Sequence, residues 1–355
     1  MNHTRIFALA LSAALSLSLM SGSQKSQPAA STPEASSPAI STPDTSAPDT
    51  STTDELLDMD VMMISGPTGV GAAYMMRDFP GEPIWNFSVV TDNSEIAAAL
   101  NSGETDIAAT ATNAAANLYN KTDGKITMLA LNTKGVLYIL EKGDTIQSMA
   151  DLKGKSIYAP VNVMGGNPEH IFHYLLTEND VDPSEVTVEW LTPQEITAKM
   201  VSGESGICLM PVPAATAVLL KDQGVRQALD LSAEWDKVSD SPLVMGSLVV
   251  RTQFLEEHPD VVDAFLKEYE KSITYMNDPA NLDSAAEMVA AQGITANAQI
   301  AAAAIPQCNL TFLVGEDMRQ AAQDYYEVLY QINPDSIGGA MPYDDFYYIP
   351  LFHFP

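Results

Sequence analysis

The stretch ALNSGETDIAATATNAAANL (Ala99–Leu118) combines the end of a helix, a Ser-Gly-Glu turn, a short strand and a loop that opens an alanine-rich helix. The same order recurs in KMVSGESGICLMPVPAATAVL (Lys199–Leu219), and the Ser-Gly-Glu turns lie at Ser102–Glu104 and Ser202–Glu204. Alternating strands and helices are typical of parallel α/β sheets. The correspondence therefore predicts two α/β lobes of similar plan, and the alternative is a chance similarity between two ordinary strand–helix units.

The sequence on either side of these stretches continues the alternation. Short apolar runs such as VMMIS, FSVVT, ITMLALN, VLYILEK, KSIYAP, VTVEWL and LVMGSLVVR predict strands, and patterns such as PEHIFHYLLTEN and PQEITAKMVSG between them predict helices. From about Pro259 onward the pattern becomes mostly helical, which predicts helices packed around a lobe that is already formed.

Two segments are predicted to cross between the lobes. In ITMLALNTKGVLYILEKG (Ile126–Gly143) two strand patterns adjoin without a helix between them, and SPLVMGSLVVRTQF (Ser241–Phe254) is the predicted return. We therefore expect a discontinuous lobe I over residues 57–133 and 245–355 and a lobe II over residues 134–244. Two connecting strands make a hinge that can close on a ligand. The predicted fold class is α/β, with two α/β lobes joined by a two-strand hinge.

Length and charge limit the classes of function. A chain of 355 residues with 46% hydrophobic composition is long enough for one large or two medium domains. The formal net charge of −29 opposes electrostatic binding to nucleic acid or to an anionic membrane surface, because both are polyanions. We expect neither as a partner.

The first residues, MNHTRIFALALSAALSLSLMSGS, have a basic start, an apolar stretch that is too short for a membrane anchor, and small residues after it. They predict a signal peptide over residues 1–22 and hence an exported protein at the cell surface or in the periplasm. Residues 23–56 are rich in Ser, Thr and Pro and predict a disordered tether. Such a tether suggests a lipoprotein, but Ser23 stands where the acceptor cysteine is expected.

The glycine-rich stretch ISGPTGVGAAYMM (Ile64–Met76) has the spacing of a phosphate-binding loop, but Ala72 and Ala73 occupy the positions of its lysine and its hydroxyl residue. The dinucleotide pattern Gly-x-Gly-x-x-Gly fails as well. What remains is a strand-to-helix loop whose glycines let a ligand approach the backbone. A purely structural tight turn is the alternative.

Three more helix starts follow predicted strands: TATNAA (Thr110–Ala115), NVMGGNPEH (Asn162–His170) and LMPVPAAT (Leu209–Thr216). Ligands of parallel α/β sheets bind outside the carboxyl ends of the strands, so the four loops are predicted to line one cleft between the lobes. None of the four contains Lys or Arg. Any anionic group would therefore be held by backbone N–H groups, hydroxyls and Asn113 or Asn167.

Catalytic and metal-binding patterns are missing from the sequence. His170 and His173 can share a helix face, yet no acidic or Cys partner stands at metal-ligand spacing, so we expect no metal site and no cofactor. Ser65 has no assignable base, and Gly-x-Ser-x-Gly is absent. Cys208 and Cys308 each lie in a strand-like run and are expected to be buried free thiols, with one disulfide as the alternative.

The segments GPTGVGAAYMM, SGETDIAATATNAAANLYNKTDGKITMLALNTKGVLYILEKGDTIQSMADLKGKSIYAP, GGNPEHIFHYLL, LMPVPAATAVL and AIPQCNLTF occur in this order. Together they resemble the solute-binding lipoproteins of bacterial ABC importers, in the branch that binds nitrate, aliphatic sulfonates, taurine and thiamine-pyrimidine precursors. The resemblance covers roughly Asp58 to Tyr348. It implies a two-lobed, type II periplasmic-binding-protein fold that closes on a small molecule and delivers it to a membrane permease and its ATPase.

By position, the resemblance carries the ligand contacts onto the four helix-start loops, and Trp85 is added as a possible stacking wall and Asn132 at the predicted crossing. The candidate ligand-binding residues are Thr68, Gly69, Val70, Gly71, Trp85, Thr112, Asn113, Asn132, Gly165, Gly166, Asn167, Pro211, Val212 and Pro213.

The main hypothesis is thus a non-enzymatic, extracytoplasmic binding component of an ABC importer that acts as a monomer on a small organic solute. One alternative is an enzyme of thiamine-precursor metabolism on the same fold, although the cysteine-rich iron motif of the enzyme-like branch has no counterpart in this chain. The other is a sensor subunit that presents its ligand to a membrane receptor.

Overall fold

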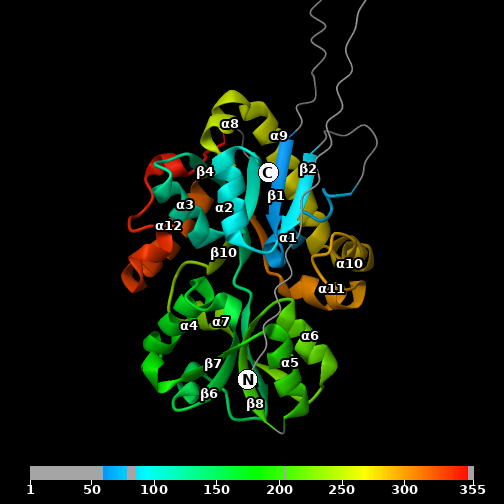
Figure 1. The fold of residues 1–355 in the computed structure, drawn as a ribbon, viewed down its shortest axis with the longest axis vertical. Helices are drawn as coiled ribbons and strands as arrows, with labels where there is room; N and C mark the ends of the chain where they lie inside the picture. The colour runs from blue at the N-terminus through cyan, green and yellow to red at the C-terminus, as the bar shows by residue number, and fades with distance from the viewer. Residues whose placement is uncertain (1–58, 78–84, 204, 351–355) are drawn as a thin grey trace, which may run out of the picture. The chain divides into compact units, whose positions relative to one another are not determined.

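The computed structural model describes residues 59–77, 85–203 and 205–350 (Figure 1). The predicted signal peptide and tether lie outside these residues, and so does Glu204 of the second Ser-Gly-Glu turn. Two β-sheets organise the described residues, one six-stranded and one five-stranded, and helices cover both. The predicted α/β class with two lobes is confirmed.

The six-stranded sheet has the order β11-β4-β10-β3-β1-β2. β1 pairs in parallel with β2 and β3, whereas β10 is antiparallel to β3 and β4, and β11 is antiparallel to β4. The strand bounds are β1 (Met59–Ile64), β2 (Trp85–Val90), β3 (Ile107–Ala111), β4 (Ile126–Lys134), β10 (Val244–Arg251) and β11 (Leu310–Leu313).

The five-stranded sheet has the order β7-β6-β8-β5-β9. β6 is parallel to β7 and β8, and β5 runs antiparallel between β8 and β9. The strand bounds are β5 (Leu137–Lys142), β6 (Ser156–Pro160), β7 (Thr187–Leu191), β8 (Gly206–Pro211) and β9 (Val225–Asp230).

The helices begin and end where local signals place them. α5, for example, begins after Thr192, whose hydroxyl and backbone N–H form a capping box with Glu195, and Pro193 occupies the first turn. The α-helices are α1 (Pro67–Val70), α2 (Asn93–Ser102), α3 (Thr112–Lys121), α4 (Asn167–Glu178), α5 (Pro193–Ser202), α6 (Ala214–Lys221), α7 (Leu231–Trp235), α8 (Thr252–Glu257), α9 (Pro259–Asn277), α10 (Leu282–Ala291), α11 (Ala298–Ala304) and α12 (Gly315–Ile332). The 3-10 helices are η1 (Met149–Leu152), η2 (Val161–Val163), η3 (Pro183–Glu185), η4 (Pro279–Asn281), η5 (Ile305–Gln307), η6 (Pro334–Ile337) and η7 (Asp344–Phe346).

The two corresponding stretches occupy equivalent places in the two sheets. β3 has a parallel neighbour, β1, on one side and an antiparallel neighbour, β10, on the other. β8 likewise lies between parallel β6 and antiparallel β5. The turns differ, because Gly103 is left-handed with φ 76° and Gly203 is extended with φ −74°. The equivalent placement favours a common plan over chance similarity.

The sheet membership of the strands supports the predicted lobe limits, which we keep as a proposal. The chain crosses from β4 to β5 through Gly135 and Val136, and it returns from α7 to β10. A third segment reaches the first crossing, since Asn309 accepts a hydrogen bond from the Lys134 N–H and its side-chain amide donates to the carbonyl of Gly135, at 2.5 Å. A Cβ on Gly135 would lie 2.2 Å from Ser232 Oγ, so the crossing needs glycine there.

The sequence patterns missed β9, α7 and α8. β9 has the sequence VRQALD, and its only fully buried positions are Val225 and Leu229, so it lacks a continuous apolar run. α7 and α8 are five and six residues long, too short to show helical periodicity. Among the described residues, no helix is long and apolar enough to cross a membrane.

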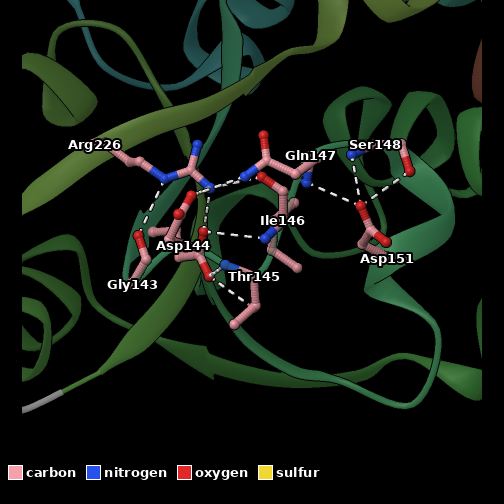
Figure 2. A network of polar contacts seen from close by, with 9 residues as sticks. Gly143, Asp144, Thr145, Ile146, Gln147, Ser148, Asp151 and Arg226 are labelled. Atoms are coloured by element: carbon pink, nitrogen blue, oxygen red, sulfur yellow. Dashed lines mark hydrogen bonds and ion pairs between the residues drawn. The ribbon is translucent and has the colours of Figure 1, made fainter.

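A buried carboxylate anchors a loop of lobe II, shown in Figure 2. Glu141 in β5 is 2% exposed and accepts hydrogen bonds from the N–H and hydroxyl of Thr145, both at 2.7 Å, and from the Ile146 N–H at 3.2 Å. Arg226 in β9 lies 2.5 Å from the same carboxylate and also donates to the carbonyls of Gly143 and Ile146. This network holds the segment between β5 and η1 against β9.

Candidate functional site

The glycine-rich turn after β1 is packed inside the lobe. Gly66 has φ 108°, and its carbonyl accepts hydrogen bonds from the N–H groups of Gly69 and Val70, both at 3.0 Å. A Cβ on Gly69 would lie 2.5 Å from the Ile64 carbonyl oxygen, and a Cβ on Gly71 would lie 2.5 Å from the Ile273 side chain. Close packing therefore explains why glycine stands at positions 69 and 71. This favours the alternative that the stretch is a structural tight turn.

Asn132 connects this turn to β4 and α9. Its side chain is fully buried, and its amide donates to the Tyr269 hydroxyl at 2.8 Å and to the Thr68 carbonyl at 3.4 Å. A Cβ on Gly246 of β10 would lie 2.6 Å from Asn132 Oδ1 and 2.6 Å from Thr68 Oγ1, so these three residues are in close contact. Burial raises the pKa of Tyr269, and its hydroxyl is protonated at neutral pH. Asn132 and Thr68 thus belong to one internal hydrogen-bonded group.

The first turn of α3 contains buried polar side-chain atoms that have no hydrogen-bond partner among the described residues. Thr112 is fully buried and its carbonyl accepts a hydrogen bond from the Tyr326 hydroxyl at 2.7 Å, whereas its own Oγ1 has no hydrogen-bond partner among the described residues. Asn113 donates from its amide to the Ser336 carbonyl at 3.4 Å. Its Oδ1 is buried and likewise has no partner in the described part of the chain.

The first turn of α4 has a similar character. The Gly165 N–H donates to the Glu169 carboxylate at 2.5 Å, and Gly166 is the residue before the helix. Asn167 is only 5% exposed, and its Oδ1 accepts a hydrogen bond from the Tyr325 hydroxyl at 2.6 Å. Its Nδ2 has no partner within the residues described. We refer to Thr112 Oγ1, Asn113 Oδ1 and Asn167 Nδ2 as the three open polar atoms.

α12 brings the first turns of α3 and α4 together. Tyr325 and Tyr326 are adjacent, both buried, and their ring centroids lie 6.0 Å apart. Tyr325 reaches Asn167 of lobe II, and Tyr326 reaches α3 of lobe I. A second contact between the lobes joins the His170 ring to the Asn333 amide, 3.2 Å apart. The adjacent tyrosines therefore contact Asn167 at the start of α4 and Thr112 at the start of α3.

The sequence patterns did not single out these tyrosines. Both lie within QDYYEV of a helix that was predicted, but their hydroxyls reach residues far away in the chain. Burial raises the pKa of each, so both hydroxyls are protonated donors at neutral pH. Two adjacent tyrosines on an otherwise amphipathic helix were the available signal.

The loop after β8, Pro211–Pro213, packs against lobe I. The Val212 N–H donates to the Val136 carbonyl at 3.1 Å, and the Val212 side chain is buried in the same apolar cluster as residues of η5. Thr216 in α6 donates to Gln307 Oε1 at 3.4 Å. Val212 thus contributes an apolar contact between the lobes, and the polar contact there comes from Thr216.

A model of the family described as NMT1/THI5 like matches residues 87–281, which is more than half of the chain. The chain belongs to the NMT1/THI5-like family. The fold also matches solved structures. A protein described as an ABC transporter from Parabacteroides distasonis is 22% identical, with a TM-score of 0.68 over 82% of this chain and 98% of that chain.

Two further solved structures are similar to this NMT1/THI5-like protein. The periplasmic aliphatic sulphonate-binding protein of Escherichia coli is 15% identical, with a TM-score of 0.65 over 84% of this chain and 96% of that chain. The ligand-binding component of an ABC-type import system from Staphylococcus aureus, solved with zinc bound, is 18% identical, with a TM-score of 0.60 over 82% of this chain and 96% of that chain. These likenesses establish the fold. No curated protein matches the chain.

Trp85, a predicted site residue, lies away from the helix-start loops in this NMT1/THI5-like structure. Trp85 pairs with Met59 at the start of parallel strands, whereas Ile64 pairs with Val90 at their carboxyl ends. Its ring packs edge-on against Phe265, with centroids 5.6 Å apart. Trp85 therefore lies at the opposite edge of the sheet from the helix-start loops, because strands β1 and β2 run in the same direction.

Metal ligands and thiols do not gather at this site. Within the described part of the chain, no group of three His, Cys, Asp or Glu residues could hold a metal ion. Burial lowers the pKa of His170, so its ring is neutral at pH 7. Cys208 and Cys308 are both free and buried, and burial raises the pKa of each thiol to about 12. Cys308 follows η5 and does not lie in a strand.

Proposed function

We propose that the chain is the extracytoplasmic solute-binding component of an ABC importer. Its fold is that of proteins described as an ABC transporter, a periplasmic aliphatic sulphonate-binding protein and a ligand-binding component of an ABC-type import system, and its family match covers most of both sheets. Such a component captures a small solute between its lobes and delivers it to a permease and an ATPase in the membrane. We propose that it does so as a monomer outside the cytoplasm, without catalysing a reaction.

The observation that carries the proposal is the group of three open polar atoms around Tyr325 and Tyr326. A buried polar atom without a hydrogen-bond partner costs about 1–3 kcal/mol. Three of the five such side-chain atoms in the described residues lie in the first turns of α3 and α4, which α12 contacts through Tyr326 and Tyr325, and together they are a sizeable cost. A bound solute that supplies the missing partners offsets this cost and stabilises the contact between the lobes.

The predicted site residues divide into two groups under this proposal. Thr112, Asn113 and the segment Gly165–Asn167 are the proposed ligand contacts. Gly165 has φ 70°, and a Cβ on it would meet no described atom within 4 Å, so its surroundings are open. Thr68, Gly69, Val70 and Gly71 form the packed loop after β1, and Asn132 holds that loop. Val212 of the segment Pro211–Pro213 packs the lobes together. We leave Trp85 out of the site.

The test measures solute capture without assuming a ligand. The purified chain is incubated with a small-molecule extract of bacterial cells, freed of unbound compounds by gel filtration and denatured, and the released compounds are identified by mass spectrometry. We expect at least one compound to be retained by the wild type and lost by Asn167→Ala. Asn101→Ala, an exposed asparagine of α2, is the matched control and should retain it.

Thermal unfolding supplies the second readout. A solute at 100 times its dissociation constant stabilises the folded state by about 2.7 kcal/mol. The released compound, added back to the wild type, should therefore raise the melting temperature. If the wild type retains nothing and no compound changes its melting, the receptor proposal is wrong. Recovery of a chemically altered compound would favour the enzyme alternative.

A further inference from the structure

We infer that the solute is uncharged and carries a hydrogen-bond donor next to an acceptor, as along the edge of an amide, lactam or urea group, and that the site does not select sulfonates, nitrate or other anions. The inference rests on the proposed function, because it concerns the ligand of the same site. It follows from the chemistry of the three open polar atoms and from the charges that surround them.

The three open polar atoms demand a ligand with both hydrogen-bonding roles. Asn113 Nδ2 faces the Ser336 carbonyl, which can only accept, so the open group of Asn113 is its acceptor oxygen. Asn167 Oδ1 accepts from the Tyr325 hydroxyl, so its open group is the Nδ2 donor. Thr112 Oγ1 can take either role. An anion, which only accepts, leaves Asn113 Oδ1 without a partner.

The side chains of Asn167 and Thr112 are both buried. Asn167 is 5% exposed and Thr112 is fully buried, so neither open atom is satisfied by bulk water. Both residues begin a helix of at least ten residues, α3 or α4, where backbone N–H groups also point away from the helix. The side chains and the helix starts therefore indicate a ligand independently of each other.

The charges around the site disfavour an anion. The four helix-start loops contain no Lys or Arg, and α12 and η6 contribute Arg319 alone, which is paired with Glu316 and Asp344. His170, the titratable base nearest to Asn167 in sequence, is neutral at pH 7 because burial lowers its pKa. An anion would thus lose its hydration without gaining a cation.

The helix starts do not replace the missing cation. A helix N-terminus attracts negative charge through its N–H groups. At α4 the Glu169 carboxylate lies in the first turn and accepts a hydrogen bond from the Gly165 N–H at 2.5 Å, so the helix start already has a negative charge beside it. At α3 the open side-chain groups are an acceptor oxygen and a hydroxyl, and the acceptor repels an anion.

Matched pairs of neutral and anionic probes test the inference by thermal unfolding of the full chain. The pairs are nicotinamide with nicotinate, uracil with orotate and benzamide with benzenesulfonate, together with taurine, methanesulfonate and nitrate. We expect a neutral member to raise the melting temperature while its anionic counterpart at equal concentration does not. We also expect the compound retained in the extract experiment to be uncharged at pH 7.

Two aspartate variants separate the roles of the asparagines. Asn167→Asp replaces the open donor by an acceptor, so we expect the affinity for the neutral solute to fall at least tenfold. Asn113→Asp keeps the open acceptor, although it also removes the amide that donates to the Ser336 carbonyl, so we expect a smaller loss of affinity than in Asn167→Asp. An anionic ligand would instead be repelled by either variant. Asn101→Asp on the exposed face of α2 controls for the added charge.

The outcomes distinguish this inference from the proposed function. If an anion stabilises the wild type and Asn167→Ala removes its effect, the receptor function stands and the inference of a neutral ligand is overturned. Equal losses of affinity in Asn113→Asp and Asn167→Asp overturn it too. If no probe shifts the melting and the extract yields no retained compound, the proposed function fails and the inference fails with it.

Discussion

Replacing Glu141 by Gln should destabilise lobe II strongly and in a pH-dependent manner. The carboxylate is 2% exposed and receives hydrogen bonds from Thr145, Ile146 and Arg226 (Figure 2). Glu141→Gln removes the charge and turns one acceptor atom into a donor that faces other donors. A hydrogen bond to a charged group contributes about 1.5–3 kcal/mol, and breaking a buried ion pair costs about 3–5 kcal/mol.

The expected loss is smaller than the sum of these contributions. Arg226 is 33% exposed, so water can solvate its guanidinium once the carboxylate is gone. It also keeps its hydrogen bonds to the carbonyls of Gly143 and Ile146. We therefore expect Glu141→Gln to lower the free energy of unfolding by about 2–4 kcal/mol at pH 7.

The pKa of Glu141 determines how the stability difference between wild type and Glu141→Gln changes with pH. Burial opposes ionisation of Glu141, but the hydrogen bonds from Thr145, Ile146 and Arg226 outweigh it, and the pKa of the folded state is lowered. A carboxyl group with a lowered pKa stabilises the fold above its unfolded pKa, about 4.3 for Glu, and this contribution is lost as the pH falls through the folded value. The difference between wild type and Glu141→Gln should therefore shrink in acid.

Urea unfolding followed by tryptophan fluorescence measures both quantities, because Trp235 is buried in lobe II. Asp144→Asn is the matched control: Asp144 lies 3.7 Å from the same arginine but is 88% exposed, so its loss should change the stability by less than about 1 kcal/mol. Equal stability of Glu141→Gln and wild type at pH 7 would refute the reasoning. So would a difference that does not diminish between pH 7 and pH 3.5.

Three further predictions concern other parts of the molecule. Gly71→Ala should lower the free energy of unfolding by about 1–3 kcal/mol in urea titrations, because the added methyl group meets α9; unchanged stability would contradict the close packing. Tyr325→Phe should destabilise the chain by about 1–3 kcal/mol, since it leaves the buried Asn167 oxygen without its donor, and an undiminished melting temperature would rule out this contact. Cys208 and Cys308 should react with a thiol reagent only after denaturation, because both are buried and free, and fast labelling of the native protein would disprove this.

The patterns that predicted the fold are local, and the structure reproduces them. The alternation of strands and helices in 99–118 and 199–219 depends on residues that contact their neighbours in sequence, so it predicted β3, α3, β8 and α6 directly. β9 escaped because a strand with only two fully buried positions lacks an apolar run. Its place in the sheet depends on pairing with β5, and no local sequence pattern reveals this long-range contact.

The candidate site was predictable only in part. Asn113 and Asn167 stood out because each lies in the first turn of a helix, and helix starts have recognisable chemistry. Tyr325 and Tyr326 did not, since their hydroxyls reach residues 158 and 214 positions away. Trp85 was included in the predicted site because an aromatic ring can stack on a ligand. This reasoning did not consider at which end of the strand the ring lies.

The segment around Asn309 adds a third connection where the lobes meet, beside the two crossings of the chain. Asn309 hydrogen-bonds to Lys134 and Gly135, and the neighbouring Gln307 accepts from Tyr138 of lobe II at 3.3 Å. Rotation of one lobe against the other must therefore carry η5 and Asn309 along or break these hydrogen bonds. A substitution at Gly135 would consequently alter solute affinity through the preferred angle between the lobes, with every ligand contact left intact.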